Sequence, residues 1–358
     1  MWANNHVKQM LRTDFPIIQA GMAGGVTSPE LVAAVSNAGA LGTIGAGYLS
    51  SAQLEKYINQ TKSLTDKPFG VNIFIPSNPK VSEAERNTAN RALAHYLEAY
   101  DITLPECDSN PSAALFDEQM NILLHYEVPV VSFTFGIPPA PAVAALKQRN
   151  ITVVGTATTV REAQLNQDAG VDVIVAQGSE AGGHRGTFTS DDSHACIGTM
   201  SLVPQMVDAV HVPIIAAGGI MDGRGVLAAL ALGAEGVQMG TAFVTCAESG
   251  ANVWHKSAIL SANEDQVLLT SSITGKTARG IENQLMRDLQ PFENDLPAYP
   301  IQHTLTKEIR KRAAEENNPE WMSLWSGQSP RLSTILPAHT IIEKIVQDVE
   351  KRIFQFKS

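Results

Sequence analysis

Residues 213–243, PIIAAGGIMDGRGVLAALALGAEGVQMGTAF, contain two short apolar runs on either side of a helical pattern. The first run, 213–219, ends in paired glycines, residues 223–232 have helical periodicity, and the second run begins at Gly236. A strand, a helix and a further strand in this order are typical of a βαβ unit with parallel strands. The stretch therefore indicates an α/β protein.

The same alternation continues outward along most of the chain. Eight strands are predicted, at residues 17–22, 40–46, 69–75, 128–136, 152–157, 171–177, 213–219 and 236–243. Helices are predicted at residues 28–38, 51–61, 139–148, 159–169, 201–209 and 223–232. Eight βα units favour a closed TIM (β/α)8 barrel, although the pattern alone leaves an open doubly wound sheet possible.

Two regions go beyond the roughly 250 residues that such a barrel needs. Residues 78–127 add helical sequence after the third strand, and residues 263–358 are rich in turns before a final amphipathic helix. We therefore expect a barrel domain over residues 1–262 with a helical insertion at about 78–127. Residues 263–358 are expected to form a C-terminal lid or extension packed on the barrel.

Composition excludes several classes of function. The 358 residues carry a formal net charge of −10, and no basic block suits a nucleic acid or an anionic membrane surface. Without a signal peptide or an apolar run of ~18 residues, the chain is expected to be cytoplasmic. Cys107, Cys196 and Cys246 lie far apart, which predicts free thiols and neither a disulfide nor a metal site. A homodimer remains possible.

Glycines lie toward the ends of the last two predicted strands, at the barrel end where chemistry is expected in the loops. Gly218 and Gly219 lie at the end of the seventh predicted strand, and Gly240 and Thr241 lie in the second half of the eighth. Phosphate sites recur in these two loops, so we predict one here, with tight turns as the alternative. Two other glycine patterns, 45–50 and 275–277, are incomplete matches to dinucleotide and P-loop motifs and predict no site.

Two amides lie at other strand ends. Asn72 and Gln177 each offer a donor and an acceptor, which suits the edge of a heterocycle such as the flavin pyrimidine. A structural hydrogen bond to a neighbouring loop is an equal alternative for either residue. Together with the glycine loops, the amides favour a bound mononucleotide.

One histidine stands among glycines in QGSEAGGHRG, residues 177–186. The glycines let this loop pass close over a flat ligand and present His184 from a strand end, which favours an active-site role over a structural one. His194 is the rival in the same loop, and His303 from the tail is not assigned to the site. The remaining candidates receive structural interpretations. Arg185 is expected to form an ion pair or a rim charge, with a substrate contact as the alternative, and Cys196 is expected to be incidental. The other histidines fall on or beside helical patterns: His95, His125, His211 and His255.

Six motifs in order resemble the nitronate monooxygenase family. They are QAGMAGG, PFGVNIF, VGTATTVREA, AQGSEAGGHRG, PIIAAGGI and GVQMGTAF. The resemblance runs from about residue 16 to 243 and continues more loosely through 274–279, 299–303 and 325–328. Because order and spacing both match, it is more specific than any single motif.

The resemblance implies an FMN-dependent barrel that oxidises alkyl nitronates, propionate 3-nitronate above all, with O2 to a carbonyl compound and nitrite or nitrate. His184 matches the active-site histidine, which would take a proton from a neutral nitroalkane or contact the nitro group. The expected FMN contacts are Met22, Asn72, Gln177, Gly182, Gly218, Gly219, Gln238, Met239, Gly240 and Thr241. The chain departs from the family at Lys276 and Thr277, where arginine and proline are usual.

Two alternative functions stay open on the sequence. The first is an NAD(P)H-dependent FMN reductase of enoyl thioesters or quinones on the same barrel, which rapid flavin reduction by NADH or NADPH would reveal. The second is a non-catalytic barrel that binds a phosphorylated ligand, which predicts a colourless protein or an unreactive flavin.

Overall fold

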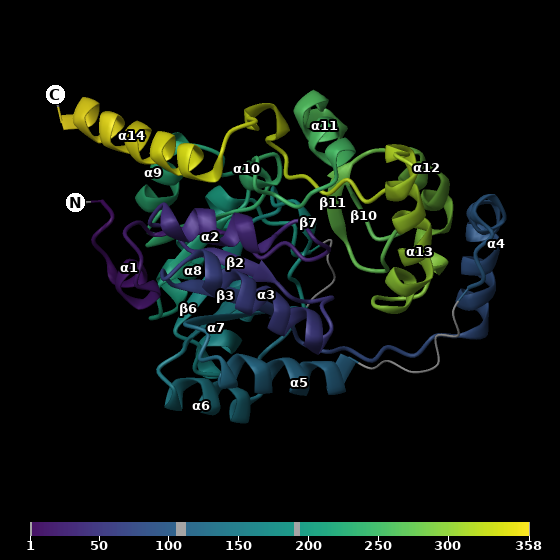
Figure 1. The fold of residues 1–358 in the computed structure, drawn as a ribbon, viewed down its shortest axis with the longest axis horizontal. Helices are drawn as coiled ribbons and strands as arrows, with labels where there is room; N and C mark the ends of the chain where they lie inside the picture. Colours follow the sequence, from purple (N-terminus) through teal and green to yellow (C-terminus); the bar gives the residue numbers. More distant parts are fainter. Residues whose placement is uncertain (1, 105–111, 190–193, 358) are drawn as a thin grey trace.

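The computed structural model describes residues 2–104, 112–189 and 194–357 and contains an eight-stranded parallel barrel (Figure 1). Its strands follow one another in space as β1-β9-β8-β6-β5-β4-β3-β2. A parallel bridge between Ile18 and Leu41 joins β1 to the start of β2 and closes the ring. The barrel strands are β1 (Ile17–Gln19), β2 (Gly42–Gly45), β3 (Phe69–Phe74), β4 (Val130–Thr134), β5 (Thr152–Ala157), β6 (Val173–Gln177), β8 (Ile214–Ala217) and β9 (Gly236–Met239). The TIM-barrel prediction is confirmed.

All eight strands are found within the predicted ranges, and the differences lie at their ends. The expectation of strand to Phe243 was wrong, because β9 ends at Met239 and the short helix α10 (Thr241–Val244) begins after Gly240. The chain therefore turns at Gly240, which belongs to the predicted phosphate site. The helices around the barrel are α2 (Pro29–Asn37), α3 (Ser51–Leu64), α5 (Ser112–His125), α6 (Ala140–Gln148), α7 (Val160–Asp168), α8 (Thr199–Ala209) and α9 (Gly223–Ala231).

Local capping explains where several helices begin. Ser28 accepts a hydrogen bond from the Leu31 amide at the start of α2, and Ser50 forms a full capping box with Gln53 in α3. Thr159 caps α7 by accepting from the Glu162 amide, and the Glu162 carboxylate accepts from the amide and hydroxyl of Thr158. These side-chain acceptors satisfy amides that the first helical turn leaves unpaired.

Two apolar layers stabilise the barrel. A small inner cluster contains strand residues such as Ile18, Val175 and Ile215, together with Val7 and Leu11 of α1 (His6–Leu11). A larger cluster packs the outer faces of the strands against the surrounding helices. The α1 contacts therefore contribute to the core inside the barrel, while the loops at the carboxyl ends of the strands carry the residues predicted for the site.

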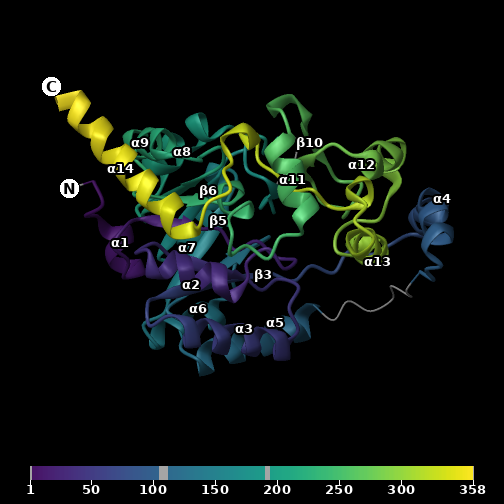
Figure 2. The ribbon, with the colours of Figure 1, turned by 45° about the horizontal axis from the view of Figure 1, so that its top comes forward.

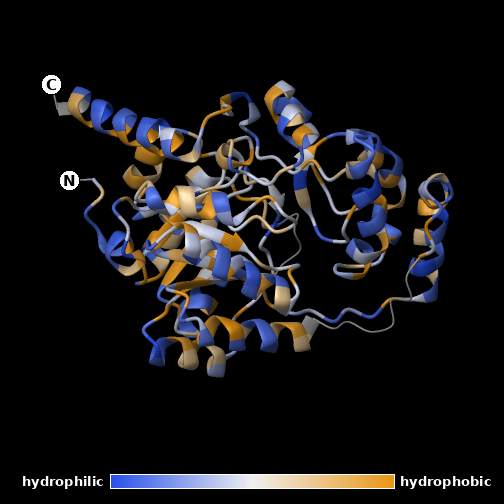
Figure 3. Ribbon diagram, viewed as in Figure 1, coloured by the Kyte–Doolittle hydropathy of each residue, from blue (hydrophilic) through white to orange (hydrophobic). Residues whose placement is uncertain are grey.

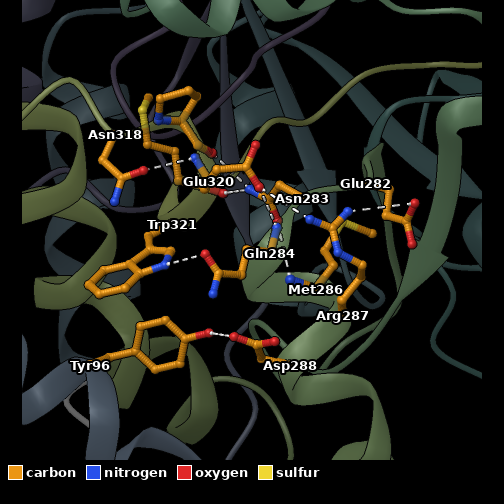
Figure 4. Close-up of polar contacts among 12 residues, drawn as sticks. Tyr96, Glu282, Asn283, Gln284, Met286, Arg287, Asp288, Asn318, Glu320 and Trp321 are labelled. Atoms are coloured by element: carbon orange, nitrogen blue, oxygen red, sulfur yellow. Dashed lines mark hydrogen bonds and ion pairs between the residues drawn. The ribbon is translucent and has the colours of Figure 1, made fainter.

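The segment expected as a helical insertion holds two helices with different neighbours. Helix α5 contacts α3 and β3 and so takes a place in the outer ring of the barrel. Helix α4 (Glu83–Tyr100) contacts α13 (Ile301–Glu315) and the 3-10 helix η2 (Gln290–Asp295) of the C-terminal region instead. Figure 4 shows the junction, where the Tyr96 hydroxyl donates to Asp288 Oδ2 at 2.7 Å. Helix α4 thus packs on the C-terminal region of the chain and not on the barrel.

The C-terminal region adds both a small sheet and helices. Strands β10 (Val267–Thr270) and β11 (Ala278–Ile281) form an antiparallel sheet with β7 (Gly183–His184), which lies outside the barrel. The helical elements here are α11 (Val253–Ser261), η1 (Glu264–Gln266), α12 (Gln284–Leu289), η2 (Gln290–Asp295), α13 (Ile301–Glu315), η3 (Pro319–Trp321), η4 (Pro330–Leu332) and α14 (Ala338–Lys357). The sheet joins the loop that carries His184 to residues almost a hundred positions later.

The predicted final amphipathic helix is present as α14. Its residues Ile341, Ile345 and Val349 are buried, and the helix contacts α2 and α9 of the barrel. Figure 3 shows hydrophobic and hydrophilic residues along the length of α14, and Figure 2 shows it on the opposite side of the barrel from α4, α12 and α13. Within the described residues, no helix combines the length and apolarity needed to span a bilayer.

Candidate functional site

A cavity of about 210 Å³ opens at the carboxyl ends of the barrel strands. One water needs only about 10–15 Å³ on such a measure, so the space suits a much larger ligand. The lining includes His184 and every residue predicted to contact the cofactor: Met22, Asn72, Gln177, Gly182, Gly218, Gly219, Gln238, Met239, Gly240 and Thr241. The structure thus brings the whole predicted set to one cavity.

One part of the lining, the glycine end, consists of Gly182, Gly218, Gly219, Gly240 and Thr241. Gly218 and Gly219 have φ angles of +124° and +68°, which side-chain-bearing residues rarely adopt. A Cβ atom on Gly218 would lie 2.8 Å from Thr199 Oγ1, and one on Gly182 would lie 2.5 Å from the Gly327 amide nitrogen. Glycine is therefore favoured at these positions, because a side chain would be strained or would collide with packed neighbours.

The Thr241 hydroxyl connects the glycine end to the C-terminal region. Its Oγ1 accepts a hydrogen bond from the Gly327 amide at 2.9 Å. The sequence places these residues 86 positions apart, so no local pattern could predict the contact. Residue Gly327 therefore completes this end of the cavity from the tail.

Glu180 lines the same end but was not predicted. Both of its carboxylate oxygens accept from the Thr199 amide at 2.9 Å, where α8 begins, and Oε2 also accepts from the Thr199 hydroxyl. A carboxylate is stabilised at a helix N-terminus by the amides and the helix dipole. Glu180 therefore supplies the hydrogen-bond acceptor for the first amide of α8. Its place inside the QGSEAGGHRG motif is the sequence signal that could have identified it as a cavity residue.

The two strand-end amides differ in what they leave for a ligand. Asn72 Nδ2 donates to the Ser132 hydroxyl at 2.9 Å and to Thr134 Oγ1 at 3.0 Å, so its donor side is bound to the neighbouring strand β4. Gln177 Nε2 donates to the His184 carbonyl, and its Oε1 accepts from the Gly186 amide at 2.7 Å. The Gln177 side chain therefore forms structural hydrogen bonds to the loop that carries His184, which is the alternative to a ligand contact given for it in the sequence analysis.

His184 lies on β7, paired with Ala278 of β11, rather than in a free loop. Its Nε2 is 2.9 Å from Thr274 Oγ1, and the Thr274 hydroxyl is 3.2 Å from the Lys276 carbonyl. The small sheet and Thr274 therefore fix the imidazole from the tail side. Loop glycines alone, on which the sequence argument rested, do not account for its position.

Aromatic rings surround the imidazole and define a second part of the site, the aromatic end: Tyr48, Phe135, His184, Tyr299 and Trp325. The ring centroids of Phe135, Tyr299 and Trp325 lie 5.9, 5.8 and 5.6 Å from that of His184. Phe135 has a φ of +74°, a strained conformation for a bulky residue that is typical of functional sites. Tyr48 and Phe135 come from barrel loops, whereas Tyr299 and Trp325 come from the tail.

The electrostatics of this end keep His184 neutral. Burial, followed by the charges of Lys276 and Arg310, lowers the pKa of His184 to about 3. Lys276 Nζ lies 5.2 Å from the centroid of the Phe135 ring and donates to the Thr187 carbonyl at 2.8 Å. Desolvation and nearby cations both disfavour the imidazolium form, so the ring is uncharged at neutral pH.

His303 lies next to this cluster, although the sequence argument left it out. Its ring stacks on Tyr48 at 4.3 Å, and its Nδ1 is 3.2 Å from an Arg310 nitrogen. Burial and the nearby charge of Arg310 lower the pKa of His303 to about 2. The Tyr48 and Tyr299 hydroxyls lie close enough to influence each other's pKa, but no hydrogen bond of ordinary geometry joins Tyr48 Oη to a described residue.

Several other residues named in the sequence analysis do not line the cavity, and one lies outside the described residues. Arg185 is not a rim charge, because it is fully buried and donates to the carbonyls of Gln177, Gly178 and Ala195. His194 and Cys196 are exposed and do not line the cavity, while Cys107 falls outside the described residues. The P-loop-like residue Gly275 lies in a turn before β11.

His255 was assigned to a helix and is indeed on α11, yet it also lines the cavity. It is buried and its Nε2 is 2.8 Å from the Trp325 carbonyl oxygen. No sequence motif includes His255, and a histidine on a helical pattern is normally structural, so sequence reasoning had no basis for placing it in the site.

Comparison with known proteins gives one consistent family. The family model described as "Nitronate monooxygenase" matches residues 4–348. A relative from Staphylococcus saprophyticus, described as "Probable nitronate monooxygenase", is 49% identical over 98% of this chain and 99% of its own. The structure of a nitroalkane oxidase from Streptomyces ansochromogenes superposes with a TM-score of 0.91 at 38% identity, covering 98% and 99% of the two chains. FabK from Thermotoga maritima superposes at 0.78 with 32% identity, covering 98% and 97%.

Proposed function

The chain belongs to the nitronate monooxygenase family, and from that premise we propose that it oxidises an anionic alkyl nitronate with FMN as cofactor and O2 as second substrate. The products are a carbonyl compound and nitrite or nitrate. Membership makes the protein an oxidoreductase, and the cofactor, the substrate and the residue roles are our proposal.

One observation carries the proposal. His184 and the ten residues expected to contact FMN all line a single cavity at the catalytic end of the barrel. They come from strand ends distributed over more than two hundred residues, and the barrel gathers them around one cavity in the combination expected for a flavin site. The proposed division is a barrel over residues 1–262 that binds FMN and an extension over 263–358 that completes the substrate side.

The glycine end fits the phosphate of FMN. The positive φ angles at Gly218 and Gly219, and the lack of room for a Cβ on Gly218 beside Thr199, favour glycine at these positions, so no side chain of theirs lies at the cavity wall. Uncovered backbone amides bind phosphate without the steric cost of a side chain. In this cavity FMN would supply the redox chemistry, and the chain's residues would bind and orient its phosphate, polyol and ring.

The aromatic end favours a substrate that is already an anion. A neutral imidazole with a pKa near 3 is a weak base toward a C–H bond. Lys276 and Arg310 make the surroundings positive, which attracts a negatively charged nitronate. We therefore assign His184 the contact to the substrate oxygens, with proton abstraction from a neutral nitroalkane as the alternative.

Thr274 determines which chemistry the imidazole can offer. If the Thr274 hydroxyl donates to His184 Nε2, then Nδ1 carries the proton and can donate to a substrate oxygen. If the hydroxyl donates to the Lys276 carbonyl instead, Nε2 donates to Thr274 and Nδ1 becomes an acceptor. The first arrangement suits the contact role that we propose.

An anaerobic spectrum tests the proposal. The purified protein should be yellow, and propionate 3-nitronate, the substrate we favour, should bleach the flavin while NADH or NADPH in a parallel cuvette leaves it oxidised. Bleaching by the pyridine nucleotide alone would instead make the protein a reductase. A protein without flavin would overturn both assignments.

A further inference from the structure

His255 is a second imidazole in the same cavity, and neither the family motifs nor the proposed function uses it. Helix α11 carries it, with Asn252 capping the helix by accepting from the Trp254 amide. Only 6% of its surface is exposed, and it lines the cavity together with Val26, Val244 and Ser329. A buried polar side chain in a ligand cavity requires partners for its polar atoms.

One hydrogen bond determines the tautomer of this ring. His255 Nε2 is 2.8 Å from the Trp325 carbonyl oxygen, and a carbonyl oxygen can only accept. Nε2 therefore carries the proton and donates it. Because burial lowers the pKa of His255, the ring is neutral and Nδ1 keeps a free lone pair. This is the one hydrogen bond that the side chain forms within the described part of the chain.

The position of His255 lies between the two ends of the cavity. The Trp325 ring contacts His184 at the aromatic end, while the Trp325 carbonyl accepts from His255. Two residues later, the Gly327 amide donates to Thr241 at the glycine end. Two residues span at most about 7–8 Å of chain, so His255 faces the middle of the cavity.

The acceptor character of Nδ1 excludes most candidate ligand groups. A nitronate, a carboxylate, O2 and a fully ionised phosphate all lack a hydrogen to donate. FMN has donors in two places, the ring N3–H at the pyrimidine edge and the hydroxyls of the polyol chain. The polyol chain joins the ring to the phosphate, which matches a position between the aromatic and glycine ends.

We propose that His255 is a cofactor-binding residue whose Nδ1 accepts a hydrogen bond from a polyol hydroxyl of FMN. The assignment rests on the proposed function, because it takes FMN as the ligand. The Nε2–H bond to Trp325 orients the ring for this contact, so one imidazole both ties α11 to the segment around Trp325 and binds the cofactor.

Two amide substitutions separate these roles. In His255→Gln the side-chain amide reaches the place of Nε2, which retains the donor to Trp325 but removes the acceptor at Nδ1. In His255→Asn the amide oxygen takes the place of Nδ1, which retains the acceptor but removes the bond to Trp325. Each variant is therefore the control for the other.

The measurement is a fluorescence titration of full-length protein, freed of flavin, with FMN, riboflavin and lumiflavin, alongside thermal melting. Lumiflavin keeps the ring N3–H but lacks the polyol. We expect His255→Gln to weaken FMN and riboflavin binding about 5- to 10-fold with lumiflavin unchanged, as loss of one hydrogen bond predicts. His255→Asn should lower the melting temperature yet bind FMN within about twofold of wild type.

Two results would overturn the inference while leaving FMN as the cofactor. In the first, His255→Gln binds FMN as tightly as wild type. In the second, it loses lumiflavin as strongly as FMN, which would place the effect at the ring or in the fold. Wild-type protein that binds no flavin would refute the proposed function itself, and this inference with it.

Discussion

The glycine end and the aromatic end of the cavity are built in different ways. The glycine end is built mainly from backbone that follows strands β6, β8 and β9, and the tail adds Gly327 beside Thr241. The aromatic end joins residues distant in sequence, as in the His184–Thr274 contact across 90 positions. The glycine end offers a fixed backbone shape, which suits a cofactor that does not vary. The aromatic end combines side chains from the barrel and the tail, which suits recognition of a particular substrate.

This difference predicts that substitutions at one end leave the function of the other intact. Variants at the glycine end should change flavin affinity, and variants at the aromatic end should change turnover of the nitronate. A substitution that affects both to the same degree would weaken the comparison.

The largest effect is expected for Gly218→Ala. The residue has a φ of +124°, and the new Cβ would lie 2.8 Å from Thr199 Oγ1 and 3.2 Å from the Gly178 carbonyl. Backbone strain and the steric conflict together should weaken FMN binding by about 100-fold or more. Flavin titration measures the loss, with circular dichroism to confirm folding.

Gly240→Ala is the matched control at the same end. Its φ is −104°, and the nearest atoms to a new Cβ are Met22 Sδ at 3.6 Å and Ala20 Cβ at 3.8 Å, ordinary contact distances. FMN affinity should stay within about threefold of wild type. Equal losses of FMN affinity in both variants would show that FMN binding does not depend on the backbone conformation and the space at Gly218.

A smaller effect is expected at the aromatic end for Thr274→Val. Valine has the shape of threonine but removes the hydroxyl 2.9 Å from His184 Nε2, which frees the ring to rotate and leaves a buried nitrogen unpaired. The value of kcat/KM for the nitronate should fall about 10-fold with FMN affinity unchanged. Thr274→Ser keeps the hydroxyl and should recover most of the activity; a serine variant as impaired as valine would contradict this role.

The smallest effect concerns acid stability. The pKa of His184 is about 3 in the folded protein and about 6.5 in an unfolded chain, so between these values the unfolded chain binds more protons. The free energy of unfolding therefore falls as pH drops below 6.5, by about 2 kcal/mol from this residue at pH 5. Above pH 6.5 the residue contributes no pH dependence.

Urea unfolding of wild type and His184→Asn at pH 7.5 and pH 5.0 measures this contribution. The stability difference between the two proteins should shrink by about 2 kcal/mol at the lower pH. A difference independent of pH would mean that His184 titrates normally in the folded state. His303, with a pKa near 2 beside Arg310, should behave similarly.

The sequence was sufficient for the barrel and for His184 and the ten predicted cofactor contacts that line the cavity, but not for Glu180 or His255 in the same lining. The strand and helix periodicities are local, and the rule that parallel strands end at one face brought residues as distant as Asn72 and Gly240 to one place. The boundary at Gly240 was missed, because an apolar run that turns into a helix has the same composition as a longer strand.

The neighbours of His184 could not be predicted in the same way. Thr274, Tyr299 and Arg310 come from a tail with no regular alternation, and the strand β7 exists only because β11 pairs with it. The environment that lowers the pKa of His184 is likewise a property of packing. Sequence reasoning therefore identified the imidazole but treated it as a base near its ordinary pKa.

The most direct test measures two quantities on one variant, His184→Asn: the FMN dissociation constant and kcat/KM. The second is measured for propionate 3-nitronate and for its carbon-protonated form, called the neutral form here because its nitro group, though not its carboxylate, is uncharged. We expect unchanged FMN affinity and a loss of about 100-fold in kcat/KM that is similar for both forms, because the imidazole contacts the substrate oxygens in both. A parallel loss of FMN affinity would contradict the separation of the two ends. A much larger loss with the neutral form would make His184 a base rather than a contact.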